Sequence, residues 1–172
     1  MIRKAQAAGR SVVFTNGCFD LLHAGHVTLL ERAKQTGDLL IVAINSDRSV
    51  RALKGPARPL VPEQDRALVL AALASVDYVT IFREPTPARL IARLRPNVLL
   101  KGADWGAADI VGRDIVERHH GRVIRVPLLK GHSTSKLVER IIRTAAGREC
   151  RKPKATARRV TREAGDETVR GS

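Results

Sequence analysis

Two histidines three positions apart, His23 and His26, lie in a segment whose residue types suit the binding of phosphate. The segment, GCFDLLHAGH at positions 17–26, follows an apolar run rich in β-branched residues and opens a helical pattern. Side chains at this spacing lie on one face of a helix. The first turn of a helix also presents unpaired N–H groups and the positive end of the helix dipole. The sequence therefore predicts a phosphate site at this strand-to-helix turn.

The elements that must position this turn follow a regular alternation along the chain. Near-continuous apolar runs are typical of strands buried on both faces, and the segments between them have helical periodicity. Such alternation predicts an α/β fold, a Rossmann-like doubly wound sheet of about five parallel strands with helices on both faces. The expected strands lie at 12–15, 39–44, 78–82, 98–100 and 123–126, and the expected helices at 21–35, 62–74, 86–94, 112–119 and 133–144.

The first expected strand ends at Asn16-Gly17, immediately before the double-histidine segment. In doubly wound sheets, ligands bind at the carboxyl ends of the strands, where the strand order reverses. The phosphate site is thus expected at the ligand-binding edge of the sheet. The periodicity fades near residue 145, so we expect one domain at 1–146 and a basic, disordered tail at 147–172.

Composition excludes several classes of protein. No apolar run approaches the ~20 residues that span a bilayer, and the N-terminus lacks the apolar run of a signal peptide. Cys18 and Cys150 fit neither a disulfide framework nor a zinc site. A zinc site of Cys18, His23 and His26 would lack a fourth ligand, so no protein-bound metal is expected. We expect a cytoplasmic protein with no membrane contact.

The net charge of +14 indicates an anionic partner. It fits a protein that handles polyphosphates, and it also fits nucleic-acid binding. The nucleic-acid alternative requires aromatic or helix-turn-helix recognition elements, and the sequence contains no such pattern. Polyphosphate binding is therefore the favoured interpretation.

The 17–26 segment resembles the signature of the cytidylyltransferase-like nucleotidyltransferase superfamily. Over residues 8–146 the chain is most similar to bacterial D-glycero-β-D-manno-heptose 1-phosphate adenylyltransferases. That resemblance implies an enzyme that converts ATP and the sugar 1-phosphate into ADP-heptose and pyrophosphate. Related heptose enzymes are often fused to a sugar kinase domain, for which this chain has no room, so we expect a stand-alone transferase and a homodimer. The resemblance also implies Mg²⁺, bound mainly through the ATP phosphates, and no covalent intermediate. The further matching segments are Asn45-Ser46-Asp47, Leu53-Lys54-Gly55, Arg58-Pro59, Asp65-Arg66-Ala67, Val76-Asp77, Lys101-Gly102-Ala103-Asp104 and Gly131-His132-Ser133-Thr134-Ser135.

For in-line attack on the α-phosphate, positioning and charge neutralisation are the main demands. By resemblance, His23, His26 and Lys54 carry catalysis, and Gly25 lets the backbone approach the phosphates. Asp20 is expected to hold the loop and the start of the helix. The nucleotide-binding residues implied are Thr15, Asn16, Gly17, Cys18, His23, Gly25, His26, Lys101, Ser133, Thr134 and Ser135.

The sugar phosphate is expected to contact a second set of residues, namely Asp47, Arg58, Arg66, Asp104 and Trp105. A carboxylate and an aromatic ring after a tight turn suit a sugar, with Asp104 on hydroxyls and Trp105 on an apolar face. The alternatives are that Trp105 packs in the core, that Arg66 only flanks the core, and that Lys54 and Arg58 lie in a solvated loop.

Two further alternatives concern the last helix and the substrate. The hydroxyls at 133–135 form either an anion cradle or a helix cap, and one segment can do both. The same fold could act on another phosphorylated acceptor, as in glycerol phosphate cytidylyltransferases or vitamin-precursor adenylyltransferases. The 17–26 segment indicates the reaction type, whereas the choice between ATP and CTP is weakly encoded.

Overall fold

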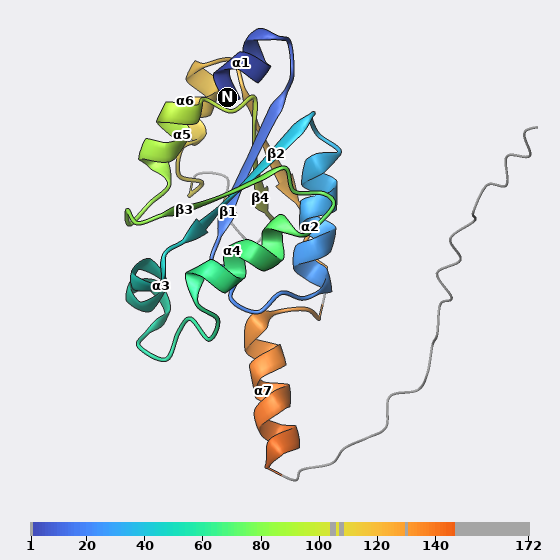
Figure 1. The fold of residues 1–172 in the computed structure, drawn as a ribbon, viewed down its shortest axis with the longest axis vertical. Coiled ribbons are helices and arrows are strands. Elements are labelled where there is room, and N and C mark those ends of the chain that lie inside the picture. Colours follow the sequence, from blue (N-terminus) through green and yellow to red (C-terminus); the bar gives the residue numbers. More distant parts are fainter. Residues whose placement is uncertain (1, 104–105, 107–108, 130, 147–172) are drawn as a thin grey trace, which may run out of the picture.

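The computed structural model describes residues 2–103, 106, 109–129 and 131–146. Its centre is a parallel five-stranded sheet with the order β3-β2-β1-β4-β5, which confirms the fold class expected from the sequence. The helices flank this sheet, and the last one points away from it (Figure 1). The strands are β1 (Val12–Gly17), β2 (Leu39–Asn45), β3 (Tyr78–Phe82), β4 (Val98–Gly102) and β5 (Arg122–Val126).

The first strand, β1, lies at the middle of the sheet between β2 and β4. Val13 pairs with Leu40 on one side and with Val98 on the other. The chain adds β2 and β3 on one side of β1, and then crosses over to add β4 and β5 on the other. The strand order therefore reverses between β1 and β4, and a ligand crevice is expected at their carboxyl ends.

Alternate side chains of β1 enter two separate cores, one on each face of the sheet. Val13 packs with Leu30 of α2 (Ala24–Lys34) and Leu70 of α4 (Glu63–Ala71). Phe14 packs on the opposite face, which α1 (Ile2–Ala7), α5 (Ala88–Leu94) and α6 (Arg113–Arg118) cover. All seven residues of β2 are buried. Burial on both faces explains why the strands read as continuous apolar runs.

Two helices differ from the sequence-based expectation. The expected loop after β2 contains α3 (Asp47–Lys54), which begins at the cap residue Ser46. The Ser46 hydroxyl accepts a hydrogen bond from the Ser49 amide at 3.3 Å. Because Val50 is the only large apolar residue that α3 buries, the helix shows no apolar stripe in the sequence. The short helix α1 was also not expected.

The start of α2 is also later than expected. The helix begins at Ala24 and not at residue 21, so His23 is its N-cap and His26 lies in its first turn. Phe19, with a φ of 47°, turns the chain in the left-handed region before the helix. The residues between β1 and α2 thus form a loop that holds the motif side chains at the sheet edge.

The last helix, α7 (Thr134–Ala145), extends away from the sheet and buries none of its residues (Figure 1). The expected tail at 147–172 lies outside the described residues. No helix within the described ranges has the length and apolar character needed to cross a bilayer.

Candidate active site

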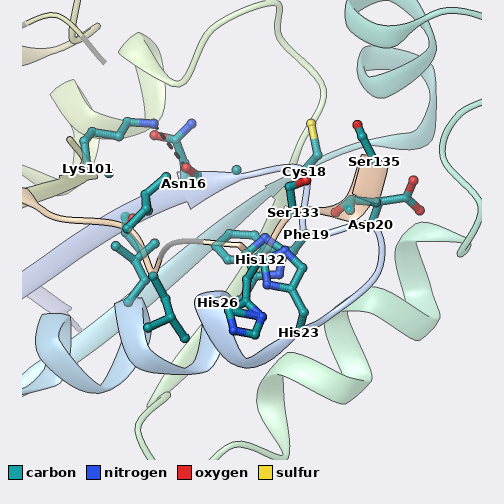
Figure 2. A pocket seen from close by; sticks show the side chains of 18 of the residues that line it. Asn16, Cys18, Phe19, Asp20, His23, His26, Lys101, His132, Ser133 and Ser135 are labelled. Carbon is teal, nitrogen blue, oxygen red and sulfur yellow. Dashed lines mark hydrogen bonds between the residues drawn. The ribbon is translucent and has the colours of Figure 1, made fainter. Parts of the chain in front are cut away.

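A cavity of about 290 Å³ opens where β1 and β4 end, at the point where the strand order reverses. Figure 2 shows Lys101 beside Asn16 on one side of this cavity and three histidines grouped on another. The lining comes from β1, the loop that follows it, the first turns of α2 and α7, and the ends of α3 and β4. The lining residues are Thr15, Asn16, Gly17, Cys18, Phe19, Asp20, His23, Gly25, His26, Leu29, Lys54, Lys101, Gly102, Leu128, Leu129, His132, Ser133, Thr134 and Ser135.

The two motif histidines stack against each other at the start of α2. The ring centroids of His23 and His26 lie 3.8 Å apart, and the ring planes differ by 20°. The ring of Phe19 also lies close to that of His26, at a centroid distance of 5.1 Å and a tilt of 54°. Within the described residues, the Nδ1 atoms of both histidines are buried without a hydrogen-bond partner. Because buried polar atoms in folded proteins are nearly always paired, these atoms indicate a ligand.

Both rings are held in the neutral form. Burial lowers the pKa of His26 to about 4, with further lowering by His23 and Lys54 and a smaller opposing effect from a backbone hydrogen bond at Leu21. Burial also lowers the pKa of His23, and the neighbouring His132 adds to this effect. A neutral imidazole carries one N–H, so each ring can donate one hydrogen bond to a phosphate oxygen.

Gly25 gives the histidine rings their space. A Cβ at this position would lie 3.0 Å from Nδ1 of His23 and 3.2 Å from Cβ of His132. Such contacts are tighter than ordinary van der Waals packing, so any larger residue would displace one of the two rings. The sequence analysis attributed the glycine at position 25 to the close approach of the phosphates. The structure adds a second reason, because the side chains of His23 and His132 already occupy the space that a Cβ would need.

A lysine lies at the end of β4, directly across the switch point from the histidines. Lys101 is 8% exposed, and its Nζ donates to the Asn16 carbonyl oxygen at 3.1 Å. The side-chain oxygen of Asn16 is buried, with no hydrogen-bond partner among the described residues. The adjoining Thr15 is also buried and lines the cavity. This wall offers a positive charge and an unused acceptor to a ligand.

Cys18 lines the cavity and also contacts Asn45, a residue at the end of β2 that does not line it. Its Sγ lies 3.9 Å from Oδ1 of Asn45, whose Nδ2 donates to the Ser49 hydroxyl at 3.0 Å. Burial raises the pKa of the Cys18 thiol above its ordinary value, although Lys54 and Arg66 oppose the effect. The thiol is therefore protonated at neutral pH, and a nucleophilic role is not supported.

Asp20 joins the loop after β1 to the segment at 58–61. Its carboxylate accepts hydrogen bonds from the amides of Leu60 at 2.7 Å and Val61 at 3.0 Å, and from Arg58 at 2.8 Å. Burial raises the pKa of Asp20, but these hydrogen bonds more than offset the effect, so the pKa is lowered. Asp20 holds the loop as expected, but it does not cap α2, whose N-cap is His23.

Arg58, Arg66 and Asp47, which the sequence analysis assigned to the sugar phosphate, do not line the cavity. Arg66 is 1% exposed and donates to the carbonyl oxygens of Val61 and Asn45, both at 2.9 Å, and to that of Cys18. It also pairs with Asp47 at 2.7 Å. These contacts tie α4 to β1, β2 and α3. A role of the three residues on substrate stays a prediction.

The turn before α7 supplies the last wall of the cavity. Ser133, Thr134 and Ser135 all line it, and the Ser133 hydroxyl caps α7 by accepting from the Lys136 amide at 3.2 Å. Ser133 thus caps the helix and lines the cavity at the same time, which is one of the alternatives considered in the sequence analysis. The predicted sugar contacts Asp104 and Trp105 lie outside the described residues.

One lining residue, His132, was not assigned to the site by sequence analysis. Its ring lies 6.3 Å from that of His23, with an interplanar angle of 24°. The available signal was its position immediately before the 133–135 hydroxyl cluster. Lys54, from the exposed end of α3, lines the same cavity as the three histidines.

The parallel sheet, its switch-point cavity, the neutral imidazoles and the two lysines together define a class of protein that binds phosphates at a strand-to-helix turn. The sequence profile of the cytidylyltransferase-like family matches residues 14–140. The chain therefore belongs to the cytidylyltransferase-like family and is a nucleotidyltransferase, which confirms the resemblance inferred from the motifs.

Individual relatives agree with this assignment. The bifunctional protein HldE of Syntrophotalea carbinolica is 54% identical over 134 residues, covering 78% of this chain and 27% of that protein. HldE of Magnetococcus marinus is 56% identical over 140 residues, covering 81% of this chain and 29% of that protein. The chain thus spans less than a third of these relatives.

A solved structure shares the fold. The crystal structure of the lipopolysaccharide core biosynthesis protein from Thermoplasma volcanium superimposes with a TM-score of 0.61 at 23% identity. The likeness covers 71% of this chain and all of the other. It supports the doubly wound architecture.

Proposed function

We propose that the chain is an adenylyltransferase that converts ATP and D-glycero-β-D-manno-heptose 1-phosphate into ADP-heptose and pyrophosphate. The observation that carries the proposal is the stacked pair of neutral imidazoles at the switch point, with Lys54 and Lys101 on the same cavity. The heptose acceptor is supported by the resemblance of segments 101–104 and 131–135. Identity above 50% to two HldE proteins over most of the chain supports it further.

The site suits a direct displacement. A phosphate oxygen of the sugar attacks the α-phosphorus of ATP in line, and pyrophosphate leaves on the opposite side. His23 and His26 donate hydrogen bonds to the phosphates as negative charge moves to the leaving group, and the lysines offset that charge. The amides at the start of α7 add donors at the cavity mouth. No side chain needs to form a covalent intermediate.

Mg²⁺ enters this proposal as part of the nucleotide substrate. Among the described lining residues, Asp20 is the only carboxylate, and both of its oxygens already accept hydrogen bonds. In the described ranges, no group of three or more His, Cys, Asp or Glu side chains is placed to hold a metal ion. These observations fit a cation held mainly by the ATP phosphates, where it would neutralise developing charge.

The proposal also includes the residues that bind the sugar phosphate, the oligomeric state of the protein and its location in the cell. Asp47, Arg58 and Arg66, with Asp104 and Trp105, are proposed to recognise the sugar phosphate, directly or by fixing the loops around it. We further propose that the protein is a homodimer and that it is located in the cytoplasm. Size-exclusion chromatography with light scattering tests the dimer.

Pyrophosphate release from a matrix of nucleotides and acceptors tests the function. ATP, CTP, GTP and UTP are each combined with heptose 1-phosphate, glycerol 3-phosphate and nicotinamide mononucleotide in the presence of Mg²⁺. We expect the highest kcat/KM for ATP with heptose 1-phosphate. If heptose 1-phosphate is inert with all four nucleotides, the sugar assignment is wrong. Turnover with another acceptor would then identify the alternative substrate.

A further inference from the structure

The cavity contains a third imidazole beside the motif pair. His132 lies in the turn before α7, exposed at the cavity mouth, with its ring 6.3 Å from that of His23. His23 in turn stacks on His26 at 3.8 Å, and the two interplanar angles are 24° and 20°. The three imidazoles therefore form one group, in which His23 is next to both His132 and His26 (Figure 2).

Local packing positions this third ring. The space beside Gly25 accommodates both His23 and His132, since a Cβ there would lie 3.2 Å from Cβ of His132. On its other side, the turn is set by Gly131, whose φ of 85° favours glycine, and by the capping bond of Ser133. His132 is thus placed by the same glycine that orders the motif pair.

The groups around the three histidines carry mostly positive charge. Lys54 reaches the cavity from α3 and Lys101 from β4, while the thiol of Cys18 is protonated. The Asp20 carboxylate faces the same cavity, but Arg58 neutralises it at 2.8 Å. Burial disfavours a proton on His23 and on His26, and the neighbouring His132 and Lys54 add to this effect on His23 and His26, respectively. A bound polyphosphate acts in the opposite direction.

We propose that His132 is a third phosphate-binding imidazole, and that polyphosphate binding makes the outer pair, His132 and His23, take up a proton from solvent. The inference deepens the proposed function and rests on the nucleotide site described there. His132 contacts the phosphates farthest from the buried His26, because it stands at the mouth of the cavity. By linkage, a ligand that draws protons onto the protein binds more tightly at lower pH.

Isothermal titration calorimetry of the full chain tests this proposal with inorganic tripolyphosphate and, separately, with ATP. Titrations at pH 7 in two buffers of different ionisation enthalpy give the number of protons taken up. The variants are His132→Gln, which keeps a hydrogen-bond donor but cannot be protonated in this range, and His132→Ala. His119→Gln is the matched control, because His119 is an exposed histidine at the end of α6 and does not line the cavity.

For the wild type and the control, we expect net proton uptake and an affinity for tripolyphosphate that falls as the pH rises from 6 to 8. His132→Gln should take up fewer protons and should bind tripolyphosphate about tenfold more weakly at pH 6.5, with a smaller difference at pH 8. His132→Ala should bind at least as weakly as His132→Gln. Unchanged thermal unfolding of both variants would exclude a folding defect.

The two ligands separate this inference from the proposed function. If His132→Gln matches the wild type in affinity and proton uptake, the inference is wrong, although ATP binding still supports the proposed function. If the wild type binds tripolyphosphate with His132-dependent proton uptake but does not bind ATP, the inference holds and the proposed nucleotide is wrong. If the wild type binds neither ligand, both are overturned.

Discussion

At the scale of single residues, the candidate site combines imidazoles that are neutral at pH 7 with lysine side chains. Burial, His23 and Lys54 lower the pKa of His26 to about 4, and two lysines, Lys54 and Lys101, line the same cavity. The site therefore presents fixed positive charge together with uncharged donors. This division suits a reaction in which negative charge moves along a triphosphate, since the neutral His26 donor can follow the charge without changing protonation.

Replacing His26 with alanine should lower kcat far more than it raises KM. The hydrogen bond from His26 is expected to strengthen as charge reaches the leaving group, so its loss acts mainly on the transition state. A loss of about 10²-fold in kcat is expected from the removal of one such donor. Steady-state pyrophosphate release measures both constants. His120→Ala, at an exposed position outside the cavity, is the control, and an unchanged kcat for His26→Ala would remove this residue from the mechanism.

The lowered histidine pKa values also predict how stability depends on pH. Because the pKa of His26 is about 4 in the folded protein and 6.5 in the unfolded chain, the unfolded chain binds more protons between these values. Stability is therefore full above pH 6.5 and is lost as the pH falls toward 4. The loss from His26 is on the order of 1 to 2 kcal/mol after allowance for solvent. Urea unfolding at a series of pH values measures it.

The variant His26→Gln isolates this contribution. Glutamine does not titrate, so the slope of unfolding free energy against pH should flatten between pH 4 and 6.5. Asp20 does not obscure the comparison, because its lowered pKa places its own loss of stability below pH 4. An identical slope in the wild type and in His26→Gln would show that His26 titrates normally in the folded protein.

At the scale of elements, α4 fastens the loops of the site through one buried side chain. Arg66 donates to carbonyl oxygens at the ends of β1 and β2 and pairs with Asp47 at the start of α3. The loop after β1 is also bound to the 58–61 segment through Asp20. The cavity thus depends on contacts made by residues that do not line it.

Replacing Arg66 with methionine should destabilise the fold. The change leaves three backbone carbonyls and the Asp47 carboxylate without their donor, which costs about 3 to 5 kcal/mol when one partner of a buried charge pair is removed. Urea denaturation measures the loss, and Arg89→Met is the control because the Arg89 side chain is 86% exposed. A stable Arg66→Met protein with a raised KM for the sugar phosphate would instead support direct substrate contact.

The strands and the position of the site were predictable because they depend on local signals. Buried parallel strands leave continuous apolar runs, and the motif follows the first of them. The helix α3 was not predictable from periodicity, since it buries little more than Val50, and its Ser46 cap was the only local sign. The network of Arg66 joins residues up to 48 positions apart, so no pattern of spacing could reveal it. His132 and His23 are more than 100 positions apart in the sequence and lie close together only in the folded protein, where both pack beside Gly25. The sequence pattern therefore could not show this contact.

At the scale of the whole molecule, the two described cores and the described cavity lining end before residue 136. Every buried apolar residue of the described ranges lies between Val12 and Val126, and the cavity lining ends at Ser135. The helix α7 contributes its first turn to the site but buries no residue of its own. The described core and the described cavity lining both fall within the predicted domain at 1–146, whose boundary stays a prediction.

A chain that ends at Ala146 should keep both its fold and its turnover. Its melting temperature should lie within a few degrees of that of the full chain, because the buried apolar residues of the described ranges all lie at or before Val126. Its kcat for pyrophosphate release should change by less than about twofold, since the described cavity lining ends at Ser135. The deletion also removes several arginines and lysines, so any salt-sensitive binding of RNA or DNA that depends on the tail should disappear. Differential scanning fluorimetry, the pyrophosphate assay and a gel-shift titration test these outcomes together. Loss of turnover with an unchanged melting temperature would place part of the catalytic machinery beyond Ala146 and would contradict the domain boundary.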